Sequence, residues 1–173
     1  VCAINVSGAS LGDDEFLGFV QDQFAMHGIP PRQVCFEITE TTAVASLTKA
    51  TEFMAALRAA GCRFALDDFG VGVSSFTYLK HLPVDYLKID GSFVRDMLDD
   101  PVNHAMVEAI HRIGHIMGKK TIAESVENRE TLRALSAIGV DYAQGYAIAV
   151  PAPFRRLHAL PKKTSKGNAA SNF

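Results

Sequence analysis

Short apolar runs alternate with longer amphipathic stretches along the chain. The short runs are mostly apolar on both faces, a pattern typical of parallel strands that are covered on both sides. They predict strands over residues 2–6, 34–38, 63–66, 86–89, 121–123 and 141–143. The amphipathic stretches carry apolar residues at helical spacing and predict helices over residues 13–27, 43–60, 76–81, 101–117 and 128–138.

Cap residues mark the ends of these predicted helices. A glycine follows several of the stretches, at the position where glycine commonly ends a helix: Gly28, Gly61, Gly118 and Gly139. Ser74 or Ser75 is expected to cap the helix over residues 76–81, and Asn128 the last helix.

The regular order of strand and helix favours an α/β fold with a parallel sheet, and short connections favour a TIM-like (β/α) barrel. A doubly wound open sheet is the alternative, but no glycine-rich phosphate motif follows the first strand. We expect residues 1–160 to form this domain and residues 161–173, which are polar and basic, to form a disordered tail. Because the chain opens in an apolar run without Met, we expect it to be an excised piece of a longer protein.

Each predicted strand finishes on, or runs directly into, polar or charged residues. These residues are Asn5, Glu37, Asp67 with Asp68, Lys88 with Asp90, Glu124 with Glu127, and Gln144. In a parallel barrel the carboxyl ends of all strands lie on one rim, where barrel active sites are built. We therefore expect residues far apart in the sequence to form one cluster rich in carboxylates.

Such a cluster favours a divalent cation, because bare carboxylates at close range repel one another. Oxygen ligands suit Mg²⁺, Mn²⁺ or Ca²⁺ better than Zn²⁺. If Asp67 and Asp68 lie in irregular backbone beyond the strand, both can face the site, and two metals there could activate a water against a phosphate ester. Singly, Glu40 and Asp90 could instead cap the helices that follow. Lys88 has no such alternative, since a buried lysine needs a partner.

Composition limits the environment and the partners. The 173 residues, 48% of them hydrophobic, are sufficient for one domain. The formal net charge of -2 gives no basic excess, so polymeric nucleic acid is not favoured as a partner. Cys2, Cys35 and Cys62 lie in or beside apolar runs without metal-type spacing, which predicts buried free thiols in a reducing cytoplasm. No apolar run is long enough to span a membrane.

Two further features have a structural interpretation beside a functional one. The stretch DDFGVGVSS over residues 67–75 is either a ligand-responsive loop or an ordinary strand-to-helix turn. His111 and His115 have the i, i+4 spacing of helical metal ligands, with His104 two turns earlier. Because no HExxH pattern is present, surface or packing histidines are the favoured interpretation.

Six motifs carry a family resemblance: INVS (4–7), FEITE (36–40), LDDFGVGVSSFTYLKHLPVDYLKID (66–90), SFV (92–94), AESVEN (123–128) and QGYAIAVPAP (144–153). With them the chain resembles the EAL domain, a bacterial phosphodiesterase that hydrolyses cyclic di-GMP. The resemblance implies a TIM-like barrel, two Mg²⁺ or Mn²⁺ ions and hydrolysis to linear pGpG. It also implies a homodimer and a parent protein, cytoplasmic or membrane-anchored, that adds sensory or GGDEF domains.

The resemblance assigns metal contacts to part of the strand-end cluster. Asn5, Glu37 and Asp67 resemble metal ligands, and Asp68 resembles a ligand of the second metal. Asp90 resembles an outer contact to metal-bound water.

The remaining cluster residues resemble catalytic groups. Lys88 resembles the lysine that orients the attacking water, and Glu124 the glutamate given a metal or general-base role. Gln144 resembles a residue of the metal and water network. Glu127 resembles the residue that anchors the loop beginning at Asp67.

Some features of the family are not in this chain. The EAL motif itself, in the pattern ExLxR, belongs to a strand upstream of Val1. In the family the Glu of this motif is a metal ligand and the Arg contacts substrate phosphate. The resemblance thus implies that two strands and a helix are missing and that the barrel is incomplete at its N-terminus. Ser125 replaces a usual Gly, Val71 and Val73 replace common Thr and Tyr, and Val150 stands where a basic residue often precedes Pro.

Three functions follow from these features. The first is a metal-dependent cyclic di-GMP phosphodiesterase. The second is a receptor module that binds cyclic di-GMP without cleaving it. The third uses only Lys88, which on a barrel strand could form a Schiff base as in aldolases.

Overall fold

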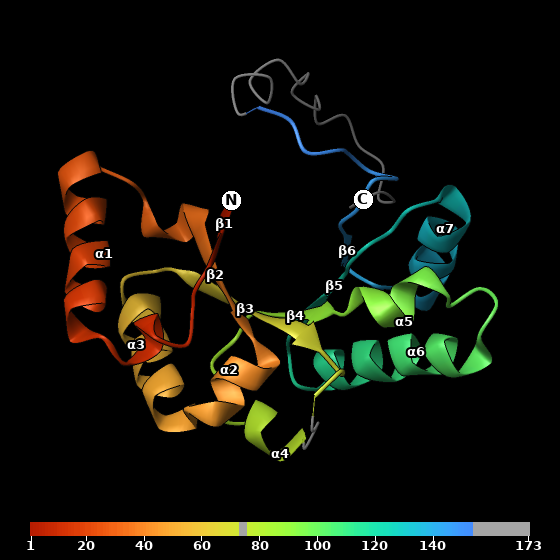
Figure 1. Ribbon diagram of the computed structural model, residues 1–173, viewed down its shortest axis with the longest axis horizontal. Coiled ribbons are helices and arrows are strands. Elements are labelled where there is room, and N and C mark those ends of the chain that lie inside the picture. Colours follow the sequence, from red (N-terminus) through yellow and green to blue (C-terminus); the bar gives the residue numbers. More distant parts are fainter. Residues whose placement is uncertain (73–75, 154–173) are drawn as a thin grey trace.

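The computed structural model describes residues 1–72 and 76–153, which form a single parallel sheet with helices around it (Figure 1). Its strands are β1 (Cys2–Asn5), β2 (Val34–Thr39), β3 (Arg63–Phe69), β4 (Tyr86–Ile89), β5 (Lys120–Ala123) and β6 (Tyr142–Ala143). Neighbours in the six-stranded sheet follow the chain order β1-β2-β3-β4-β5-β6, and every pairing is parallel. A doubly wound sheet would reverse its strand order, so this topology confirms the predicted TIM-like barrel, here an incomplete one.

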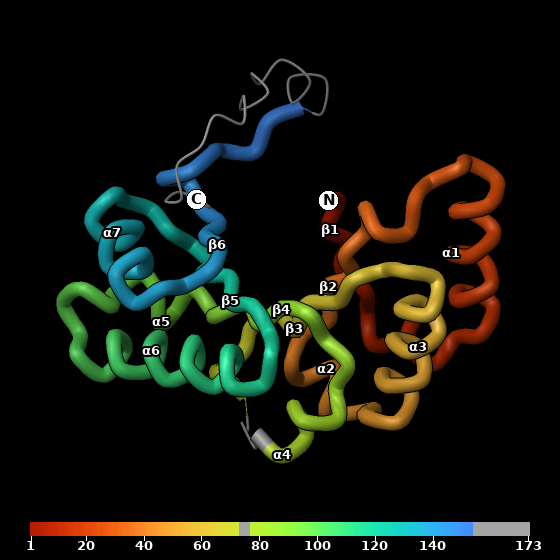
Figure 2. The backbone as a smooth tube through the Cα atoms, turned by 180° about the vertical axis from the view of Figure 1, so that it is seen from behind, coloured from red at the N-terminus to blue at the C-terminus, as the bar shows by residue number. Residues whose placement is uncertain are grey.

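The helices lie in two groups, one beside each end of the sheet (Figure 2). They are α1 (Asp14–His27), α2 (Glu40–Ala45), α3 (Leu47–Ala59), α4 (Phe76–Leu79), α5 (Gly91–Arg95), α6 (Pro101–Ile116) and α7 (Arg129–Ile138), with short turns η1 (Ser10–Gly12) and η2 (Pro31–Gln33). Figure 2 shows α1 and α3 beside one end of the sheet and α5, α6 and α7 beside the other. Within the described residues, no helix is both long and apolar enough to cross a bilayer.

One helix prediction was wrong, and one helix was not predicted. The helix predicted over residues 43–60 is two helices, because Ser46 with φ -141° and ψ 54° leaves the helical conformation between them. The first of the two begins at Glu40, since the Thr39 side chain accepts the Thr42 N–H and caps it. Helix α5 was not predicted, because five residues are too few to show a helical period.

The predicted caps are confirmed where the structure describes them. Gly28 and Gly139 adopt the left-handed conformation after α1 and α7, and the Asn128 side chain accepts the Thr131 N–H at 2.8 Å. Ser74, Ser75 and the predicted tail over residues 161–173 lie outside the described residues.

Phenylalanines fix the first half of the sheet against its helices. Phe36 on β2 and Phe64 on β3 have ring centroids 5.6 Å apart, and Phe53 from α3 packs edge-on against both. All three rings are buried. Burial of such a side chain contributes roughly 1.5–3 kcal/mol, so these contacts hold β2 and β3 rigidly beside each other.

The thiols do not all have the predicted environment. Cys35 and Cys62 are buried, but Cys2 is exposed because it lies on β1, an edge strand whose four residues are all exposed. Burial, with the nearby charge of Glu37, raises the pKa of Cys35 to about 12. We expect Ellman's reagent to modify Cys2 rapidly and the other two thiols only after unfolding. A Cys2→Ser variant should lose the rapid phase; rapid modification of more than one thiol would contradict this environment.

Candidate active site

The parallel register brings the predicted polar residues to one edge of the sheet. Asn5 at the end of β1 is paired with Glu37 of β2. Glu124 follows β5, and its N–H donates to the carbonyl of Ile89 at the end of β4 at 3.2 Å. Gln144 directly follows β6. Residues from every strand of the sheet therefore approach one rim, as the sequence predicted.

Lys88 lies at the centre of this rim. Its Nζ is 2.8 Å from Glu37 Oε2, 2.7 Å from Asp67 Oδ1 and 2.7 Å from Glu124 Oε1. The lysine side chain is 3% exposed, and its three partners are between 11% and 17% exposed. The ammonium group therefore fixes carboxylates from β2, from β3 and from the end of β5 in one small volume.

The protonation state of Lys88 tests the Schiff-base hypothesis. Burial alone would lower the pKa of this amine, but hydrogen bonds with Asp67, Glu124 and Glu37 hold the pKa above its ordinary value. A Schiff-base lysine must be neutral to attack a carbonyl. The arrangement keeps the amine protonated, so the geometry does not favour an aldolase.

The backbone of β3 presents two consecutive aspartates. The predicted end of this strand at residue 66 was wrong, since β3 continues to Phe69 and contains both aspartates. The irregularity is inside the strand, where the register with β4 shifts between Leu66 and Phe69 and Asp68 has a φ of 53°. Such a bulge redirects a side chain, which is why two adjacent aspartates can both reach the rim.

The rim is suited to cations because its carboxylates are crowded. Oxygen atoms of Asp67, Asp68 and Glu124 all lie within 4.8 Å of one another. Burial raises the pKa of Glu124 despite its hydrogen bond with Lys88, and the charges of the two aspartates raise it further. Burial and the charges of Asp67 and Asp90 likewise raise the pKa of Asp68. Lys88 offsets only part of this repulsion, and the all-oxygen donor set fits a hard divalent cation such as Mg²⁺, Mn²⁺ or Ca²⁺.

Asp90 caps a helix, which is one of the two roles that the sequence left open for it. Its Oδ1 accepts the Ser92 N–H at 2.7 Å and caps α5. The charge of the same carboxylate helps to raise the pKa of Asp68, so capping α5 also holds Asp90 near the predicted metal ligands.

Glu40 is a site residue whose role sequence reasoning missed. Its carboxylate is 2% exposed, accepts the Gly70 N–H at 2.9 Å through Oε2, and accepts the Tyr78 hydroxyl through Oε1. These two hydrogen bonds connect the end of β3 to α4. The second acidic residue of the FEITE motif, which is Glu40, could have indicated this role. The sequence analysis considered it only as a possible helix cap.

The anchoring role of Glu127 stays a prediction. Its side chain is exposed, and part of the stretch that it was expected to anchor, residues 73–75, lies outside the described residues.

Gly145, next to Gln144, lies in close contact with the backbone of Val126. A Cβ at this glycine would lie 2.3 Å from both the N and the O of Val126, and its φ of 153° is one that other residues rarely adopt. We expect Gly145→Ala to reduce the free energy of unfolding by at least about 1–3 kcal/mol, because the backbone at Val126 or at residue 145 must move.

The matched control for this substitution is Gly18→Ala. A Cβ at Gly18 in α1 has no atom within 4 Å. This change should be neutral or stabilise by about 0.5–1 kcal/mol, since alanine is the better helix former. Urea unfolding of both variants measures the difference, and equal stabilities would contradict the close contact at Gly145.

Comparison with known proteins identifies relatives of this arrangement. The family model described as "EAL domain" matches residues 1–151. The cyclic di-GMP phosphodiesterase PdeB of Shewanella oneidensis is 46% identical over 151 residues, which is 87% of this chain and 18% of that protein. The chain thus spans about a fifth of the length of this curated relative.

Solved structures agree with the fold. A MucR phosphodiesterase in complex with c-di-GMP, from Pseudomonas aeruginosa, superimposes with a TM-score of 0.85 at 32% identity, over 90% of this chain and 63% of that one. Klebsiella pneumoniae BlrP1, described as a calcium/cy-diGMP complex, has a TM-score of 0.78 at 32% identity, over 84% and 37% of the two chains. Both resemble the described residues in sequence as well as in fold.

Proposed function

The chain belongs to the EAL domain family, and from this premise we propose that it hydrolyses cyclic di-GMP to linear pGpG at the rim around Lys88. The observation that carries the proposal is the contact of one buried ammonium group with Glu37, Asp67 and Glu124 at the carboxyl ends of the strands. Relatives named as cyclic di-GMP phosphodiesterases, and similar structures bound to c-di-GMP, support the substrate.

Two divalent ions, Mg²⁺ or Mn²⁺, would be held by the oxygen donors of this rim. The residues proposed as ligands are Asn5, Glu37, Asp67 and Asp68, with Asp90 as an outer contact. When bound, such ions polarise a phosphate ester, lower the pKa of a water and stabilise the leaving oxygen. The crowded oxygens of Asp67, Asp68 and Glu124 support this assignment, because a divalent charge relieves their repulsion.

The side chains of the chain itself would then direct the proton and the water. Lys88 donates hydrogen bonds that fix the positions of Glu37, Asp67 and Glu124, and it can orient the attacking water. Glu124, with its raised pKa, is suited to accept a proton from that water. The water adds to one phosphorus, the bond from that phosphorus to the ribose 3′ oxygen breaks, and the leaving oxygen takes up a proton. Gln144 would orient the water by hydrogen bonding.

The assembly of the protein is part of the same proposal. We expect the domain to work in the cytoplasm, as a homodimer, and with sensory or GGDEF domains in its parent protein. MucR, one of the relatives, is named as a bifunctional diguanylate cyclase and cyclic di-GMP phosphodiesterase.

One experiment separates hydrolysis from binding. The chain, and a version extended upstream by whatever residues the gene encodes before Val1, are incubated with cyclic di-GMP and Mn²⁺ while pGpG is followed by chromatography. Equilibrium dialysis with labelled cyclic di-GMP measures binding in parallel. Turnover by either form supports the phosphodiesterase, and binding without turnover by both would support the receptor instead. Neither binding nor turnover would refute both functions.

A further inference from the structure

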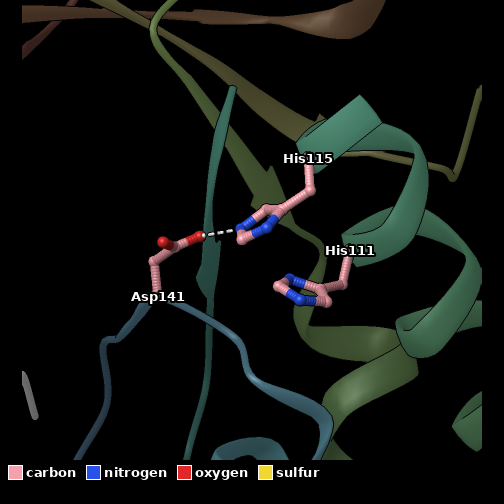
Figure 3. Close-up of side chains that lie close together, drawn as sticks. All are labelled: His111, His115 and Asp141. Carbon is pink, nitrogen blue, oxygen red and sulfur yellow. Dashed lines mark hydrogen bonds and ion pairs between the residues drawn. The ribbon is translucent and has the colours of Figure 1, made fainter. Parts of the chain in front are cut away.

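His111 and His115 lie against a carboxylate that the sequence did not place near them. Figure 3 shows both rings on one side of α6, facing Asp141, which precedes β6. His115 Nε2 is 2.7 Å from Asp141 Oδ2, and the two ring centroids are 4.2 Å apart. Each of the three residues offers a ligand atom, and these atoms lie within 4.8 Å of one another.

Hydrogen bonds around Thr121 orient two of these groups. The Thr121 N–H and hydroxyl both donate to Asp141 Oδ2, at 2.9 and 3.3 Å. When this hydroxyl proton points to the carboxylate, the Thr121 oxygen accepts a hydrogen bond from His111 Nδ1, 2.8 Å away. This leaves the lone pair of His111 on Nε2. Metal-binding histidines commonly donate their second ring N–H in this way, which fixes the ring and its tautomer.

The charge states also suit a metal ligand set. Burial and the neighbouring His115 lower the pKa of His111, which favours the neutral imidazole that a metal requires. Burial opposes ionisation of Asp141, but hydrogen bonds from His115 and Thr121 hold its pKa below the ordinary value, so it is a carboxylate.

The cluster is accessible and separate from the candidate active site. The His115 side chain is 46% exposed, and both histidines line a surface cavity of about 690 Å³ together with Glu108, Arg112 and Ile138. Thr121 is near the first residue of β5, whereas Glu124 follows its last residue. The two clusters therefore lie at opposite ends of a strand roughly 10 Å long.

We propose that His111, His115 and Asp141 bind a borderline transition-metal ion of the Zn²⁺, Co²⁺ or Ni²⁺ class. Two imidazole nitrogens and one carboxylate oxygen suit such ions and not Mg²⁺. The ion takes the place of the proton between His115 and Asp141. Metal–ligand bonds of about 2.0–2.2 Å need a wider separation than the present 2.7 Å, and the half-exposed His115 ring can move back to allow it. Three protein ligands leave one tetrahedral position to water. The bound ion links α6 to the segment that precedes β6.

The absence of an HExxH pattern favoured surface or packing histidines, and the spacing along one helix cannot show a ligand that lies opposite it. Asp141 follows His115 by 26 positions, and only the fold brings it into contact.

Equilibrium dialysis of the whole chain against Zn²⁺, with excess Mg²⁺ to compete at the rim, tests the proposal. We expect His115→Ala to lose one equivalent of bound Zn²⁺, with its affinity reduced at least about 100-fold, since even removing an outer-shell partner costs 10–100-fold. His104→Ala is the matched control, because His104 is on the same helix but 3.7 Å from Glu108 and outside the cluster. Asp67→Asn should also keep this equivalent. Equal stoichiometry in wild type and His115→Ala would overturn the site.

A measurement on the wild-type chain covers a variant that fails to fold. Addition of Zn²⁺ should shift the NMR signals of the ring nitrogens of His111 and His115 and leave those of His104 unchanged. Tetrahedral Co²⁺ should give visible absorption bands that Zn²⁺ displaces. Unmoved ring signals, or bands that persist in His115→Ala, would refute the proposal.

Discussion

Asp67→Asn is expected to abolish metal-dependent cleavage of cyclic di-GMP, with a loss of at least about 100-fold in turnover, since a metal ion contributes several kcal/mol of transition-state stabilisation. The substitution keeps the size of the side chain but removes its charge. Asp67 contacts Lys88 at 2.7 Å and lies within 4.8 Å of oxygens of Asp68 and Glu124, so its charge acts at the centre of the rim. Production of pGpG at saturating Mn²⁺ measures the effect, and Glu37→Ala should behave alike.

The control for this prediction is Asp99→Asn. It is the same chemical change on an exposed residue between α5 and α6. This variant should cleave cyclic di-GMP at the wild-type rate. Wild-type turnover by Asp67→Asn, at several Mn²⁺ concentrations, would refute the assignment of the rim as the active site.

Lys88→Met is expected to lower the free energy of unfolding by about 3–5 kcal/mol in the presence of EDTA, because removal of one partner from a buried ion pair leaves uncompensated charge. Here Glu37, Asp67 and Glu124 would lose their shared cation. Addition of Mn²⁺ should restore part of this loss, because a divalent ion that binds the folded state stabilises it. Urea unfolding with EDTA and with Mn²⁺ measures both effects.

Two comparisons make the test of Lys88 specific. Lys80→Met changes an exposed lysine and should leave the free energy of unfolding within about 0.5 kcal/mol of wild type in either condition. Lys88→Met should also lose turnover, even where Mn²⁺ restores stability, if the lysine orients the attacking water. Equal stability of Lys88→Met and wild type in EDTA would contradict the ion-pair network.

The strand and helix order, and the edge on which the site lies, could be predicted from the sequence. Buried parallel strands must be apolar on both faces, so runs such as residues 86–89 are visible without a structure, and Lys88 within that run is an evident exception. Boundaries were less well predicted where a single cap or turn decides them. The break at Ser46 and the start of α2 at Glu40 depend on local backbone angles and on the Thr39 cap, which periodicity does not report.

The sequence by itself determined the α/β class, the family resemblance and the set of polar residues at the strand ends, because these depend on residue type and order. Only the tertiary structure decided which of those residues touch. The fold places Lys88 in contact with three carboxylates that are 51, 21 and 36 positions away in the sequence. It also brings Glu40 to the backbone of β3 and Asp141 to His115. Contacts between distant residues depend on the register of strands and on the bulge in β3, and a one-residue change of register would direct the same side chains to the other face.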